Sequence, residues 1–213
     1  MKYITHALSP LLALTADTVK DVVAYGSTRL TPDRVGRYDN PFPLEVGLFR
    51  LRSSDVIGEV TMSFFQTARP YTEGFTIYGD EMSVEWPEDM DGPLTVHEML
   101  PLEGPQPETG LRGRRSRTSR VEPDDDTDVL PEALRPLVRP FLLQPATGGA
   151  PIRKRAEHSG SHPFLVHEFL SAITEDRPAA IDAPTAAAWT APGIVAHASA
   201  MSGGERLAVP AYR

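Results

Sequence analysis

The last part of the chain, residues 158–212, contains the signals that most constrain the fold. Asp182-Ala183-Pro184 is typical of a helix start, and the alanine-rich segment that follows ends at Gly203-Gly204. Before that helix, the segment after a Gly/His-rich loop places apolar residues at helical spacing: Leu165, Val166, Phe169, Leu170 and Ile173. The sequence therefore predicts two consecutive helices, followed by a short strand that ends in Val209-Pro210.

The first half of the chain favours strands. A helix is predicted over residues 4–15, and strands over residues 19–26, 44–52, 56–66, 75–78, 82–86 and 94–100. Alternating residue types over 56–64 indicate a strand with two unlike faces. Several hairpin-like strands followed by helices predict an α+β fold, an open, mostly antiparallel β-sheet with helices packed on one face. We expect residues 1–213 to form a single domain.

Residues 103–129 differ from the rest in composition. Five arginines between 112 and 120 precede an acidic run, and apolar residues are almost absent. Ordering such a segment costs conformational entropy with little burial in return, so we expect a mobile surface insertion. A polyanion site on these arginines is the alternative, although the adjacent acidic residues would largely neutralise it.

Composition excludes several functional classes. The formal net charge of −8 disfavours nucleic-acid binding, which needs a basic surface. No apolar stretch has the roughly 20 residues of a membrane span, and the first residues make a poor signal peptide. The absence of cysteine rules out disulfides and thiolate metal sites. We expect a cytoplasmic protein.

The order of signals in residues 158–212 resembles the C-terminal end of the Gfo/Idh/MocA oxidoreductase family. In this family an N-terminal Rossmann domain holds NAD(P), and a second domain built on an open sheet supplies much of the substrate site and the oligomer contacts. The resemblance implies that this chain begins inside the second domain. It also implies NAD(P) for the full-length protein and homo-oligomers formed through the open sheet face.

The motifs of the nucleotide-binding half are missing from the sequence. There is no G-x-G-x-x-G loop after a strand, and no Glu-Lys-Pro type motif that would supply the family's catalytic lysine. We therefore expect no nucleotide-binding domain and no cofactor-binding or metal-binding residues in this chain.

His6 is the candidate catalytic residue. In sugar-alcohol dehydrogenases of the family, an aspartate and a histidine four residues apart open a helix, and the histidine takes part in proton transfer. Aligning that helix with residues 4–15 places the histidine at His6 and the aspartate position at Lys2. A carboxylate near an imidazole orients the ring and stabilises its charged form, whereas a lysine does not. An ordinary histidine at a helix start is the alternative.

His158, His162 and Arg69 are the candidate substrate-binding residues. The two histidines flank Ser159-Gly160-Ser161, in a loop whose position before a helix suits hydroxyl or anionic ligands. Similar loops lie beside the substrate in some branches of the family. Helix capping by Ser161 is an alternative, and a metal pair is another. Arg69 could bind an anionic substrate group, or it could belong to an ordinary turn.

Two classes of function remain open. In the first, the chain is the C-terminal part of an NAD(P)-dependent oxidoreductase for a sugar, polyol or related hydroxy compound, inactive by itself. In the second, it is a standalone non-catalytic module that dimerises or binds a sugar, or the partner of a separate Rossmann subunit. A glycosidase-like use of NAD shares the same fold.

Overall fold

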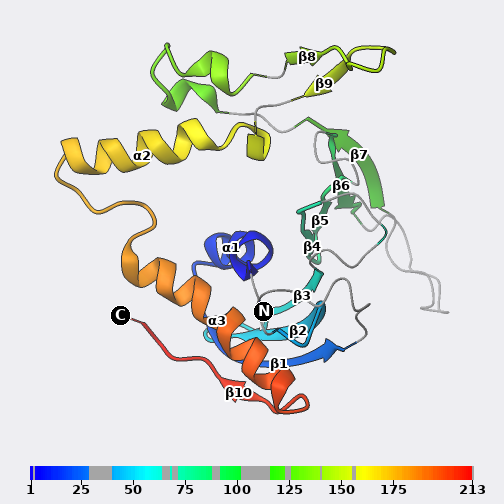
Figure 1. The fold of residues 1–213 in the computed structure, drawn as a ribbon, viewed down its shortest axis with the longest axis vertical. Helices are drawn as coiled ribbons and strands as arrows, with labels where there is room; N and C mark the ends of the chain where they lie inside the picture. Colours follow the sequence, from blue (N-terminus) through cyan, green and yellow to red (C-terminus); the bar gives the residue numbers. More distant parts are fainter. Residues whose placement is uncertain are drawn as a thin grey trace. The chain divides into compact units, whose positions relative to one another are not determined.

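The computed structural model describes residues 1, 3–28, 40–63, 68, 72–87, 92–101, 116–122, 126–139, 141–154 and 157–212. The chain divides into two compact units (Figure 1). Unit 1 consists of Met1–Glu73 and Ile181–Arg213, and unit 2 consists of Gly74–Ala180. Each unit is described by itself.

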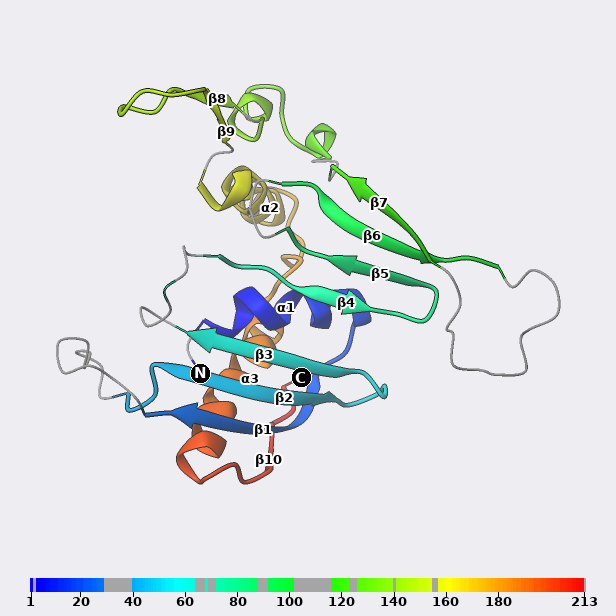
Figure 2. The same cartoon turned by 90° about the vertical axis from the view of Figure 1, so that its right-hand side faces the viewer.

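Unit 1 is an antiparallel sheet with two helices on one face. Its sheet has the order β10-β1-β2-β3, formed by Leu207–Ala208, Val19–Ser27, Leu44–Leu51 and Ile57–Ser63 (Figure 2). The helices are α1, Ile4–Thr15, and α3, Ala183–Met201. Every strand pair in this sheet is antiparallel. The predicted α+β class, with an open antiparallel sheet and helices on one face, is confirmed.

Alternation along the strands decides which face of this sheet is buried. Val22 and Ala24 of β1 and Phe49 of β2 have no exposed surface and face the helices. Helix α1 contributes Leu8 and Leu12 to the same core, and both are almost completely buried. The opposite face of the sheet keeps apolar side chains that are half or more exposed: Tyr25, Leu48 and Ile57.

Helix α3 begins and ends where the sequence predicts. The Asp182 carboxylate accepts a hydrogen bond from the Thr185 amide at 2.8 Å, which caps the helix start. At the other end Gly203 and Gly204 have φ values of 70° and 91°, a conformation that glycine adopts without a Cβ clash. The Gly204 amide donates to the carbonyl of Ser199 at 2.9 Å and so closes the last turn.

Unit 2 contains a second antiparallel sheet, of order β4-β5-β6-β7 (Figure 2). Its strands are Thr76–Tyr78, Met82–Glu85, Leu94–Met99 and Ser116–Val121. A two-stranded ribbon follows, formed by β8, Phe141–Leu143, and β9, Ile152–Lys154, and then α2, His162–Thr174. The short 3-10 turns are Thr127–Val129, Arg135–Leu137 and Glu157–Gly160.

Strand β7 lies inside the segment that the sequence predicts to be a mobile insertion. Residues 116–121 pair with β6 along their whole length, and Arg117 binds Glu98 of that strand at 2.7 Å. Backbone pairing to an existing strand therefore orders residues that have little apolar surface to bury. The rest of the basic run, up to residue 115, lies outside the described residues, as do residues 123–125.

Helix α2 has the predicted period but does not bury its apolar side chains. The stripe formed by Leu165, Val166, Phe169, Leu170 and Ile173 is 53–61% exposed, and only Ala172 of this helix is buried. Helical spacing thus predicts the helix correctly without deciding what covers its apolar face. No helix in the described ranges is long and apolar enough to cross a membrane.

Candidate functional site

His6 forms a contact with a carboxylate at the start of α1. Its Nδ1 lies 3.0 Å from Oε2 of Glu73, a residue that follows β3 at the end of the first segment of unit 1. The two side chains are 35% and 23% exposed, so the pair is partly shielded from water. The Tyr3 ring lies against the imidazole, with a centroid separation of 5.7 Å and an angle of 44°. The imidazole is therefore held between an aromatic ring and a carboxylate.

The sequence alone does not reveal this partner. The family pattern places a carboxylate four residues before the histidine, where this chain has Lys2, a residue outside the described ranges. Glu73 comes instead from a segment beyond three strands. No spacing rule connects residues so far apart, so only the folded chain brings them together.

An open groove lies between the first turn of α1 and the middle of α3. Its volume is about 390 Å³. The lining is mostly apolar with three hydroxyl-bearing side chains, and consists of Met1, Tyr3, Ile4, Thr5, Thr190 and Ile194. Grooves of this size and character hold small ligands in many proteins. Tyr3 belongs both to the groove and to the contact with His6, so it links the two.

A buried carboxylate fixes the start of α1 against α3 and β2. The Glu45 side chain is only 4% exposed, and its Oε1 lies 2.7 Å from Nδ1 of His197. Its Oε2 lies 3.2 Å from the Met1 nitrogen, which donates to the Gly193 carbonyl at 2.7 Å. A buried carboxylate needs such partners to offset its lost hydration. This arrangement positions the turn that carries Tyr3 and His6.

His158 and His162 lie together in unit 2. Their ring centroids are 4.9 Å apart, with an angle of 41° between the planes. His158 has a φ of 51°, in the left-handed region, and His162 is the first residue of α2. Ser161 occupies the N-cap position, but no hydrogen bond from its side chain caps the helix. Within the described residues, no group of three or more His, Asp or Glu side chains could hold a metal ion.

The remaining sequence candidates do not all lie in one described part of the chain. Arg69 lies outside the described residues. His6 belongs to unit 1, whereas His158 and His162 belong to unit 2. The structure thus brings the two loop histidines together and pairs His6 with Glu73.

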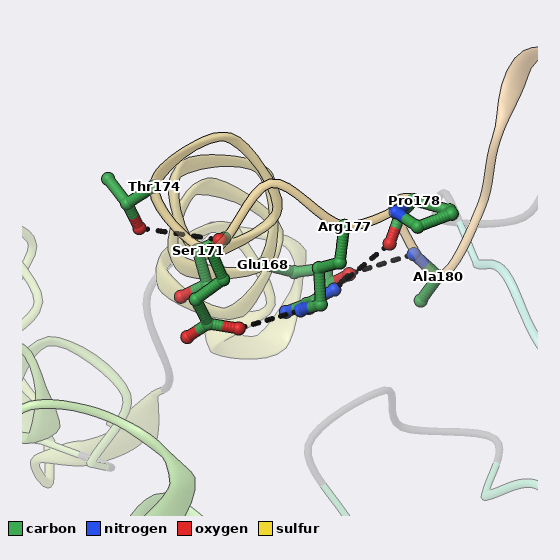
Figure 3. Close-up of polar contacts among 7 residues, drawn as sticks. Glu168, Ser171, Thr174, Arg177, Pro178 and Ala180 are labelled. Carbon is green, nitrogen blue, oxygen red and sulfur yellow. Dashed lines mark hydrogen bonds and ion pairs between the residues drawn. The ribbon is translucent and has the colours of Figure 1, made fainter.

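The lowered pKa of Glu168 in unit 2 has a structural cause. Arg177 forms hydrogen bonds of 2.8 and 2.9 Å to the Glu168 carboxylate, which also accepts from the Ala180 amide at 2.8 Å (Figure 3). These contacts, led by the Arg177 guanidinium, lower the pKa of Glu168 to about 2. Arg177 also binds Glu175 at 2.8 Å. The network fixes the turn after α2, and its residues need no catalytic role to explain the shift.

Comparison with solved structures identifies the fold. The chain aligns with levoglucosan dehydrogenase in complex with NADH over 91% of its length, with a TM-score of 0.57 and 18% identity. It aligns with an NAD binding oxidoreductase from Klebsiella pneumoniae over 91%, with a TM-score of 0.54 and 15% identity. The chain has the fold of Gfo/Idh/MocA-type dehydrogenases. The resemblance found in the sequence is thereby confirmed at the level of fold.

The alignments cover less than half of these dehydrogenases. The chain spans 45% of the levoglucosan dehydrogenase chain and 46% of the Klebsiella pneumoniae chain. No family model matches the sequence, and no curated protein matches it.

Proposed function

We propose that this chain is the substrate-binding and assembly part of an NAD(P)-dependent oxidoreductase that acts on a sugar, polyol or related hydroxy compound. The observation that carries the proposal is the His6–Glu73 pair next to Tyr3, a residue that lines an open groove, in a fold shared with dehydrogenases. One of these, levoglucosan dehydrogenase, has been crystallised with NADH and levoglucosan. An imidazole beside a carboxylate is suited to exchange a proton with a substrate hydroxyl near neutral pH. His158, His162 and Arg69 are proposed to contact the substrate.

The described residues do not fit a dinucleotide cofactor. A dinucleotide fold needs parallel strands joined by helices and a glycine-rich turn. Every strand pair among the described residues is antiparallel, and the sequence contains no such turn after a strand. We therefore propose that NAD(P) is held by a different part of the enzyme. The 213-residue chain should then show no turnover with NAD(P)H by itself.

Two measurements test this division of roles. The purified chain is mixed with NAD(P)H or NAD(P) and a panel of sugars and polyols, and absorbance of the reduced nicotinamide is followed. Turnover by the chain alone would contradict the proposal.

The DNA upstream of the Met1 codon is the second test. An in-frame glycine-rich βαβ coding region supports a two-domain enzyme, whereas a promoter and ribosome site there support a separate cofactor-binding subunit or a standalone module.

The face of the unit 1 sheet opposite the helices favours an assembly role as well. Tyr25, Leu48 and Ile57 lie on the face opposite the helices and are 63%, 50% and 62% exposed. Exposed apolar side chains gathered on one sheet face are typical of a protein–protein interface. We propose that a second copy of the chain covers it and forms a homo-oligomer.

Light scattering tests the oligomer. Leu48→Lys places a charge in the middle of the exposed face and should dissociate the assembly, because an unpaired charge buried at an interface is costly. Leu14→Lys is the matched control, since Leu14 is 70% exposed but lies on α1. A monomeric wild-type chain, or equal effects of the two variants, would exclude an interface on this sheet face.

A further inference from the structure

The contact between Glu73 and His6 assigns a role to a residue that no sequence pattern indicates. The Glu73 carboxylate oxygen lies 3.0 Å from Nδ1 of the ring, an ion-pair distance. Glu73 follows β3 and is the last residue of the first segment of unit 1, Met1–Glu73. The contact therefore connects the start of α1 to the end of that segment. Both side chains are more than half buried, which keeps the pair from being fully screened by solvent.

A carboxylate at this atom determines where the imidazole holds its proton. An ionised carboxylate only accepts hydrogen bonds, and at 3.0 Å it would repel a lone pair on Nδ1 of His6, so the form with the hydrogen on Nδ1 is favoured. In the neutral ring, Nε2 then has the lone pair and is the atom that accepts a proton. When the ring is protonated, the carboxylate balances the new charge. Glu73 thus determines both the tautomer of His6 and its orientation.

A second contact restricts the rotation of the same ring. The Tyr3 side chain lies 5.7 Å from the imidazole centroid, and Tyr3 also lines the open groove. Rotating the imidazole about its Cβ–Cγ bond would break the Glu73 contact and displace the ring from Tyr3. The two contacts together favour one orientation of the ring.

We propose that Glu73 is the positioning residue of His6, and that it replaces the carboxylate missing at position 2. It holds the proton on Nδ1 so that Nε2 exchanges a proton with a hydroxyl group of the substrate. This inference rests on the proposed function, in which His6 handles the substrate proton. Glu73 itself acts through the imidazole and does not touch the substrate.

Nitrogen-15 NMR of histidine-labelled protein tests the positioning role directly. At alkaline pH, where the rings are neutral, wild-type His6 should show the Nδ1–H tautomer as its majority state. Glu73→Ala should make the Nε2–H tautomer the majority, because that form is preferred by a histidine without a partner at Nδ1. Glu73→Gln should retain part of the Nδ1–H form, since its amide oxygen still accepts a hydrogen bond.

Two controls are available within the same unit. Glu59→Ala removes an exposed carboxylate from β3 and should leave the His6 tautomer unchanged. His197, whose Nδ1 lies 2.7 Å from Glu45, gives a reference signal for a carboxylate-bound ring in every spectrum. If His6 keeps the Nδ1–H tautomer in Glu73→Ala, or lacks it in the wild type, the positioning role is overturned.

A titration separates this inference from the proposed function. Levoglucosan and myo-inositol are added to the labelled wild-type chain, and the Nε2 resonance of His6 should shift, with the shift reduced in Glu73→Ala. A tautomer change in Glu73→Ala without any response to either compound would overturn the proposed substrate role of His6 and leave Glu73 as a structural partner. A response to the compounds that is equal in wild type and Glu73→Ala would retain the binding function and overturn the role of Glu73.

Discussion

Substitution of Gly193 by alanine tests how closely α1 approaches α3. Gly193 is buried in α3, and a Cβ atom added there would lie 2.6 Å from Cγ2 of Ile4 and 2.7 Å from the Met1 carbonyl oxygen. The carbonyl is backbone and cannot rotate away, so the start of α1 must move. Overpacking of this kind costs about 1–3 kcal/mol. The higher helix propensity of alanine offsets about 1 kcal/mol of it.

The expected net effect of Gly193→Ala is a loss of about 0–2 kcal/mol in the free energy of unfolding, where the full propensity gain of about 1 kcal/mol would otherwise appear. For a chain of this length, each kcal/mol lowers the melting temperature by roughly 2–4 °C. Tyr3 and His6 lie on the turn that must move, so the variant should also disturb the ring contact between them.

Urea unfolding followed by fluorescence measures this loss in unit 1. A Trp86→Phe background leaves Trp189, which packs against the core of unit 1, as the only tryptophan. Ala198→Gly is the matched control, because Ala198 is exposed in the same helix and reports helix propensity alone. If the close approach of α1 to α3 determines the outcome, Gly193→Ala and Ala198→Gly should both lower the free energy of unfolding. A gain in Gly193→Ala that mirrors the loss in Ala198→Gly would refute the close approach.

Two further predictions concern carboxylates. Burial by itself raises the pKa of Asp17, but hydrogen bonds, led by the one from the Ser53 amide, outweigh burial and leave the pKa below its ordinary value. The ionised Asp17 carboxylate therefore stabilises the fold at pH values above its ordinary pKa. This stabilisation is lost as the pH falls through the lowered pKa. Asp17→Ala should cost about 1–3 kcal/mol in urea unfolding at neutral pH and weaken the acid dependence, and an unchanged midpoint would contradict this role. For Glu168, whose pKa is lowered to about 2 mainly by Arg177, the turn after α2 should stay closed at pH values above the ordinary 4.5 and open as the pH falls toward 2. Hydrogen exchange of the Ala180 amide measures this opening as a protection factor. Arg177→Gln should remove the pH dependence of that protection factor. Equal protection in the wild type and in Arg177→Gln would exclude the network.

The elements with strong local signals are the ones that the sequence predicts well. Helix α1 has the predicted bounds, residues 4–15, and α3 begins after Asp182 and ends before Gly203 as expected. Capping carboxylates, terminal glycines and the strand period of two act within a few residues, so they can be read without knowledge of the fold.

Elements that depend on a partner strand are predicted less well. Strand β7 has an unremarkable sequence, and it is a strand because β6 offers unpaired backbone groups. Helix α2 shows the opposite case, since a clear apolar stripe predicts its helical form but not its exposure.

For the candidate site, the sequence by itself determined which residue types are present: a histidine at the start of a helix, a lysine four residues before it, and two histidines at the start of another helix. Only the tertiary structure decided that Glu73 supplies the carboxylate to His6 and that His158 and His162 lie ring against ring. The physical reason is the short distance over which these contacts act. Hydrogen bonds and ring contacts act over a few ångströms in space, and the fold alone decides which distant residues come within that distance.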